Sequence, residues 1–118
     1  MRKIAWTPDG VESLNEILEY YKDRAGENVA NNIYDKIMKE IELLEMEEVK
    51  TKQTQELKDI GIFDVHELVI KPWKVYYKIG GKNKTIYILF VLDGRRNLEE
   101  VLLSKVIDNK ISPFNTLP

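Results

Sequence analysis

The sequence contains no cysteine and a single histidine, His66. The absence of cysteine excludes disulfide bonds and thiolate chemistry. With one histidine, a zinc site would need carboxylates for most of its ligands. The chain also lacks a glycine-rich phosphate loop and a nucleophile elbow. We therefore expect neither a metal ion nor a cofactor.

Long apolar runs and a surplus of charge are also missing. No apolar stretch approaches the roughly 18 residues of a membrane span, and Met1-Arg2-Lys3 precedes only a short apolar segment rather than a signal-peptide core. We expect a cytosolic protein without membrane contact. The 18 basic and 20 acidic residues give a net charge of −2, so a polyanion site would have to be a local basic cluster.

What remains suits one compact domain. The chain has 118 residues, 43% of them apolar or aromatic, which is enough for a single core. We find no internal repeat and no low-complexity segment. The sequence predicts one domain over residues 1–110 and a C-terminal tail over residues 111–118.

Two amphipathic helices are predicted in the first half, after a short strand at residues 3–6. Thr7 suits the N-cap of the first helix, Pro8 its first position and Gly26 its end. Apolar residues then recur every three or four positions in both segments. These residues are Val11, Leu14, Ile17, Leu18 and Tyr21, then Val29, Ile33, Ile37, Ile41 and Leu44. The two segments form a helical hairpin.

Three strands and a last helix are predicted after an irregular polar loop at residues 50–58. Alternating or continuous apolar residues mark the strands at 63–70, 73–79 and 86–92. The last of these is apolar throughout, so both of its faces should be covered. A helix at residues 98–110 completes the order β-α-α-β-β-β-α. This order predicts an α+β domain with the hairpin on one face of an antiparallel sheet.

The strand register follows from the length of the turns. An even turn after residue 70 places Leu68 opposite Val75 on the covered face, and His66 opposite Tyr77. His66 is the one side chain whose ordinary pKa suits proton transfer near neutrality. The alternative for a lone histidine in a strand is a structural role.

Basic groups are predicted to converge on the other, open face. Lys74, Tyr76 and Lys78 share it, and an even second turn would bring Arg95 there too. Lysines could hold a phosphate backbone while the tyrosine stacks a base. The alternative is an ordinary open face whose lysines prevent edge pairing. Further basic residues that could extend the surface are Lys52, Lys71 and Arg96.

Arg95 and Arg96 follow the end of the last strand after the turn Asp93-Gly94. The guanidinium of arginine can donate two parallel hydrogen bonds to a phosphate or a carboxylate. A residue at the end of a strand has a fixed backbone position from which to make them. The alternative is a solvated turn, or an ion pair with Glu99 or Glu100.

The segments WKVYYKI (residues 73–79) and YILFVLDGRRNLEEVL (residues 87–102), with the order of elements, resemble the RelE and ParE superfamily of type II toxin–antitoxin (plasmid stabilisation) toxins. The resemblance spans about Lys3 to Ile107. It implies a growth-inhibiting toxin that a cognate antitoxin neutralises. The toxin would form a homodimer, or a heterotetramer with that antitoxin. RelE-like members cut mRNA on the ribosome, whereas ParE-like members inhibit DNA gyrase.

If the chain were a ribonuclease, the resemblance would assign catalysis to three residues. Lys74 takes the place of a family arginine on the third strand, and Arg95 that of the arginine after the last strand. His66 can align with an arginine of some relatives. Lysine at position 74 keeps the positive charge but cannot make the two parallel hydrogen bonds of a guanidinium.

Two departures from the RelE pattern argue against cleavage. Its strand-two lysines would fall near Val65 and Glu67, and no tyrosine or histidine follows Tyr87 to act as acid or base. The GRRN ending and the acidic balance also favour a ParE-like gyrase inhibitor that contacts its target through the arginine end of the sheet and the hairpin. The alternatives are a RelE-like endoribonuclease and a degenerate member that only binds an antitoxin.

Overall fold

The computed structural model describes residues 2–46, 52–53, 64–81, 84–95, 100–101 and 104. In chain order its elements are β1 (Ile4–Trp6), α1 (Pro8–Ala25), α2 (Glu27–Glu42), the 3-10 turn η1 (Leu43–Glu45), β2 (Lys52–Gln53), β3 (His66–Ile70), β4 (Trp73–Gly80) and β5 (Thr85–Asp93). Residues 100, 101 and 104 are helical. The rest of the predicted C-terminal helix, and the tail, lie outside the described residues.

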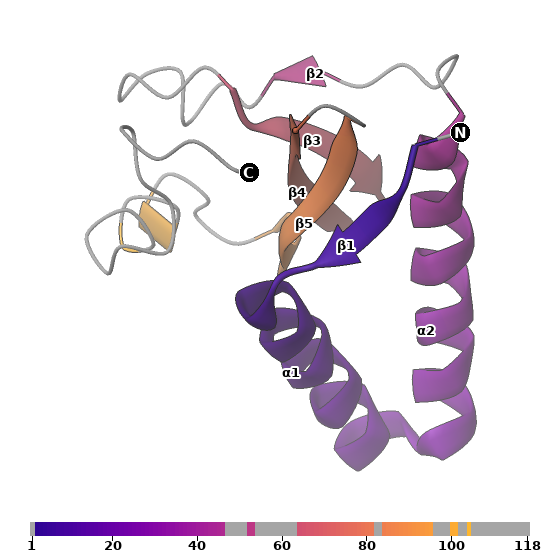
Figure 1. Ribbon diagram of the computed structural model, residues 1–118. Coiled ribbons are helices and arrows are strands. Elements are labelled where there is room, and N and C mark those ends of the chain that lie inside the picture. Colours follow the sequence, from indigo (N-terminus) through magenta and orange to yellow (C-terminus); the bar gives the residue numbers. More distant parts are fainter. Residues whose placement is uncertain are drawn as a thin grey trace.

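The strands form one sheet in the order β1-β5-β4-β3-β2. Neighbours from β5 to β2 are antiparallel, whereas β1 pairs with β5 in parallel. The sheet is therefore mixed and not, as predicted, antiparallel throughout, because the N-terminal strand enters beside β5 before the chain turns into the helices. The arms of the α1–α2 hairpin diverge towards the sheet (Figure 1), where α1 contacts β5 and α2 contacts β3. The predicted α+β fold is confirmed.

The helix ends agree with the capping signals. The side chain of Thr7 accepts a hydrogen bond from the Gly10 N–H at 3.0 Å, and Pro8 begins α1. Gly26 ends α1 with φ at +96°, a conformation that glycine adopts without the steric penalty of a side chain. The next helix begins at Glu27, so the hairpin turns within a single residue.

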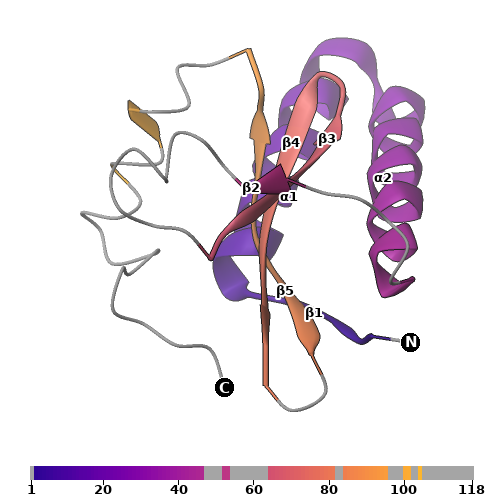
Figure 2. The same ribbon diagram turned by 90° about the horizontal axis from the view of Figure 1, so that it is seen from above.

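The core lies between the hairpin and the sheet. Both helices and three strands contribute buried side chains to one cluster. Its members are Leu14, Ile33, Ile37, Ile41 and Leu44 from the helical half and Ile70, Trp73, Val75, Tyr77, Ile86, Ile88 and Val91 from the sheet. Most apolar residues of the two predicted stripes are buried or partly buried against the sheet, whereas Val11 and Val29 are exposed. Figure 2 shows the two helices and the sheet from above.

The predicted register of the β3–β4 hairpin is confirmed. Leu68 pairs with Val75, and His66 pairs with Tyr77. The polar stretch expected to be a loop contains the two-residue strand β2, whose Lys52 pairs with Glu67 of β3. Backbone pairing with an exposed strand edge needs no apolar pattern, so the sequence did not indicate this strand.

A β-bulge interrupts the β4–β5 register. Tyr76 pairs with Phe90, but the next residue, Tyr77, pairs with Ile88, so Leu89 has no partner of its own. An extra residue reverses the alternation of side chains along the bulged strand. Before the bulge the even-numbered Ile88 faces the helices, and after it the odd-numbered Val91 does.

Candidate functional site

The face that carries Tyr76 and Lys78 is covered, not open. Tyr76 is fully buried and Lys78 is only 4% exposed. Phe90 and Leu92, which pair with Tyr76 and Lys74 across the strands, are buried there too. The predicted open face is therefore wrong: β5 is apolar on both sides, and its second side also lies in the interior. No base could stack on Tyr76 in this state.

The lysines of that face are paired with acids. Lys74 Nζ lies 3.7 Å from Glu67 Oε2, a carboxylate that is 4% exposed. Lys78 Nζ lies 3.3 Å from Asp64 Oδ2. Each ion pair lowers the net positive charge that either lysine could offer to a phosphate.

Arg95 lies on the opposite side, facing the helices. Its Nη2 donates to the Tyr21 hydroxyl of α1 at 3.4 Å, and it shares a pocket with Val91. The prediction that Arg95 joins Lys74 and Tyr76 on one face is wrong, because it assumed unbroken alternation along β5. The bulge at Leu89 shifts every later residue to the other face.

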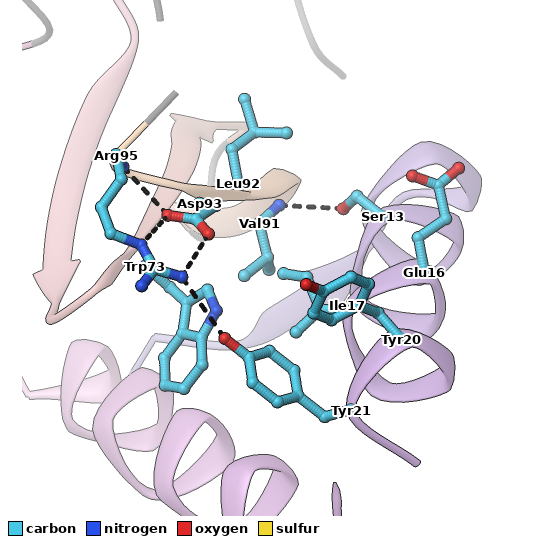
Figure 3. Close-up of a pocket in the computed structure, with 10 residues that line it drawn as sticks. All are labelled: Ser13, Glu16, Ile17, Tyr20, Tyr21, Trp73, Val91, Leu92, Asp93 and Arg95. Carbon is cyan, nitrogen blue, oxygen red and sulfur yellow. Dashed lines mark hydrogen bonds and ion pairs between the residues drawn. The ribbon is translucent and has the colours of Figure 1, made fainter. Parts of the chain in front are cut away.

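Asp93 holds the Arg95 guanidinium in a fixed fork (Figure 3). Arg95 Nε donates to Oδ1 at 2.9 Å and Nη2 to Oδ2 at 2.7 Å, while the Arg95 backbone N–H also donates to Oδ1. These bonds, with that to Tyr21, raise the pKa of Arg95 further above its ordinary value. The Arg95 side chain is 65% exposed. Exposed arginine side chains are usually mobile, but these hydrogen bonds hold the Arg95 guanidinium in place at the surface.

Beside this fork is a cavity of about 370 Å³, which we call the Arg95 pocket. It lies between α1 and the end of β5 (Figure 3). Its lining residues are Ser13, Glu16, Ile17, Tyr20, Tyr21, Trp73, Val91, Leu92, Asp93 and Arg95. The buried floor is apolar and the rim carries hydroxyl, carboxylate and guanidinium groups.

Small and hydroxylated residues of α1 hold the helix against β5. Thr7 Oγ1 donates to the Ile88 carbonyl at 2.8 Å, and Ser13 Oγ accepts from the Val91 N–H at 2.9 Å. A Cβ on Gly10 would lie 2.5 Å from the Ile88 oxygen, so only glycine permits this approach. β1 pairs with β5 only as far as Ile88. Next to the bulge, α1 therefore supplies the hydrogen-bond acceptor for the β5 backbone, at Val91.

Aromatic rings run along the rim of the pocket. Tyr20 and Tyr21 meet edge to face at 5.2 Å between ring centroids, and Tyr21 and Trp73 at 6.0 Å. The Arg24 guanidinium lies 4.5 Å from the centroid of Tyr20, and Lys36 Nζ lies 5.7 Å from that of Trp73. Cation–π contacts of this kind restrict both partners.

His66 lies apart from the pocket. Ile70 of β3 pairs with Trp73, which lines the pocket. His66 stands four residues before Ile70, about 13 Å along the strand, and its ring stacks on Tyr77 with 5.4 Å between centroids. Burial lowers the pKa of His66, against an opposing effect of Asp64. The structure therefore does not bring His66 and Arg95 to one reacting group.

The remaining basic candidates are dispersed. Lys71 is exposed in the β3–β4 turn, and its carbonyl accepts from Lys36 Nζ at 3.1 Å. Lys52 contributes its backbone to β2, and Arg96 lies outside the described residues. Within the described ranges, no group of three acidic or histidine residues could hold a metal ion, and no helix is long and apolar enough to cross a membrane.

Sequence reasoning missed most of the pocket. It singled out Arg95 but gave no role to Asp93, Ser13 or Glu16. The signal that could have pointed to Ser13 is its spacing of three from Gly10, since two small residues on one helix face permit close packing against a strand.

Comparisons with known proteins agree with this fold. A family model described as ParE toxin of type II toxin-antitoxin system, parDE, matches residues 4–98. A chain of the chromosomal ParDE TA system from P. aeruginosa superposes with a TM-score of 0.66 at 18% identity, covering 79% of this chain and 96% of that one. The isolated E. coli RelE toxin superposes more loosely, with a TM-score of 0.49 at 11% identity, covering 94% of this chain and 100% of that one. No curated protein sequence matches.

Proposed function

The chain belongs to the family of ParE toxins of type II toxin–antitoxin systems, and on this premise we propose that it stops growth by binding DNA gyrase through the surface around Arg95. As a toxin of this family it has an antitoxin partner. The proposal takes residues 1–110 as the toxin domain and the cytoplasm as its place of action, since the target acts on chromosomal DNA.

The observation that carries the proposal is the separation of Arg95 from the other predicted catalytic groups. RNA cleavage by a 2′-hydroxyl needs charge stabilisation and an acid or base within hydrogen-bond reach of one phosphate. Here Lys74 is paired with Glu67 on one face, Arg95 is on the other, and His66 is at the far end of β3. This arrangement supports a binding protein over a RelE-like ribonuclease.

The composition around Arg95 supports a protein partner. Arginine, tyrosine and tryptophan dominate the energetically important residues of protein interfaces. Arg95, Tyr20, Tyr21 and Trp73 all line one pocket. The end of a central strand, held to α1 by hydrogen bonds, gives such residues fixed positions before binding.

A supercoiling assay with purified gyrase tests the proposal. We expect the wild-type protein to inhibit supercoiling at micromolar concentration, and Arg95→Ala to raise the half-inhibitory concentration about tenfold or more, as for a central interface residue. Lys39→Ala, which removes an exposed cation on α2, is the matched control and should stay within about twofold. Lack of inhibition by the wild-type protein would contradict a gyrase target.

Two further readouts separate the alternatives. The wild-type protein should leave transcripts intact in a purified translation system, and cleavage that depends on Arg95 would instead assign the RelE-like activity. Induced expression without antitoxin should arrest growth. Unaffected growth would favour a degenerate member that only binds its antitoxin.

A further inference from the structure

We propose that the Arg95 pocket is the anchor site for one apolar side chain of the target protein, and that a basic residue beside this side chain meets Glu16. The inference rests on the proposed function in one respect, that the surface around Arg95 faces the target. It goes further in stating what the target presents: an apolar anchor with a neighbouring positive charge, and not a phosphate.

The size and lining of the pocket suit a single side chain. At about 370 Å³ it is near the lower end of the roughly 300–1,000 Å³ of small-ligand sites. Its floor consists of Trp73 and Val91, which are each 5% exposed or less, and Ile17 forms part of the wall. An apolar group that enters replaces water against these surfaces, which is favourable by about 25 cal/mol per Å².

The rim is held in position before binding. Tyr20 is 52% exposed, yet its ring contacts both the Arg24 guanidinium and the Tyr21 ring. A large exposed aromatic ring that is already restricted loses little further conformational entropy in a complex. Exposure together with restriction makes Tyr20 the candidate for the strongest single contact.

The charges of the pocket disfavour a phosphate. Asp93 takes up the positive charge of Arg95 through the fork, and Glu16 is exposed and forms no ion pair with any part of the chain that the structure describes. Among the described residues that line the pocket, Glu16 is therefore the charged group that is not paired with an opposite charge. Nη1 of Arg95, which makes no hydrogen bond to the described residues, can still donate to a neutral acceptor such as a peptide carbonyl.

The outer surface of α1 extends this negative charge. Four acidic residues of the helix are exposed, Glu12, Glu16, Glu19 and Asp23, against two exposed basic residues in its last turn, Lys22 and Arg24. A basic segment of a protein is complementary to this surface, whereas a nucleic-acid backbone is repelled by it.

Growth arrest on induced expression without antitoxin tests whether the pocket is needed for toxicity, whatever the target is. The supercoiling assay tests separately whether that target is gyrase. The variants are Tyr20→Ala and Glu16→Lys. Their matched controls are Tyr34→Ala and Asp35→Lys, which change an exposed tyrosine and an exposed acid of α2 outside the pocket. A cooperative thermal transition followed by circular dichroism is the check that each of the four variants folds. We expect both pocket variants to need about tenfold more protein for the same arrest, and both controls to stay within about twofold.

The other outcomes are equally informative. If Glu16→Lys strengthens the arrest, the pocket meets a polyanion and the proposal is overturned. If both pocket variants arrest growth like the wild type, the pocket does not bind the target; if they also escape neutralisation by a co-expressed antitoxin, it belongs to the antitoxin. If the pocket variants lose arrest but wild-type protein leaves supercoiling unchanged, the pocket proposal stands and gyrase is the wrong target. A wild-type chain that leaves growth unaffected overturns both proposals.

Discussion

Replacing Ser13 by alanine removes the hydroxyl that joins α1 to β5 next to the bulge. Ser13 is 6% exposed, and its Oγ accepts from the Val91 N–H and donates to the Gly10 carbonyl, both at 2.9 Å. Alanine leaves the Val91 N–H buried without this acceptor. The neighbouring backbone cannot compensate, because β1 ends before it reaches this part of β5.

The expected size of the loss follows from these contacts. Orphaning a buried backbone donor is unfavourable by about 1–3 kcal/mol, and the better helix propensity of alanine offsets about 0.5 kcal/mol of it. We expect Ser13→Ala to lower the free energy of unfolding by about 1–2 kcal/mol. In a chain of this size that lowers Tm by roughly 3–10 °C.

Urea denaturation and native-state hydrogen exchange measure the effect. The control is Asn15→Ala, an exposed substitution on the same helix, which should change the free energy of unfolding by less than about 0.5 kcal/mol. The Val91 amide should exchange faster in Ser13→Ala than in the control by more than the global loss explains. Equal stability of the two variants, with unchanged exchange at Val91, would refute the view that α1 completes the bonding of β5.

Two further substitutions test the same fold. Gly10→Ala should lower stability by about 1–3 kcal/mol despite the better helix propensity of alanine, because the new Cβ would meet the Ile88 carbonyl oxygen at 2.5 Å; thermal unfolding measures it, and an unchanged Tm would contradict the close approach. His66→Gln should reduce the acid sensitivity of folding: burial lowers the pKa of His66 below 6.5, so the unfolded chain binds the proton more tightly and stability is lost as the pH falls through 6.5. Urea denaturation from pH 8 to 5.5 tests this, and parallel curves for the two proteins would show that His66 titrates alike in both states.

The sequence by itself determined the elements and much of their pairing. Thr7, Pro8 and Gly26 act locally, so the bounds of α1 could be predicted from them. The even turn before Trp73 set the β3–β4 register, because side chains alternate strictly in an unbroken hairpin. The continuous apolar run of β5 indicated that both of its faces are covered, and the same strand with its GRR ending identified the family before any coordinates.

Only the tertiary structure decided on which face each candidate site residue lies. The bulge at Leu89 has no marker in the sequence, since apolar residues fill β5 on both sides of it, yet it moves Arg95 from the face of Lys74 to that of Tyr21. Burial of Lys78 beside Asp64 could not be seen either, because a lysine on an alternating strand resembles a solvated one. Side-chain direction after a bulge depends on how distant segments meet, as Ser13 meets Val91 here, and local patterns contain no information about that encounter.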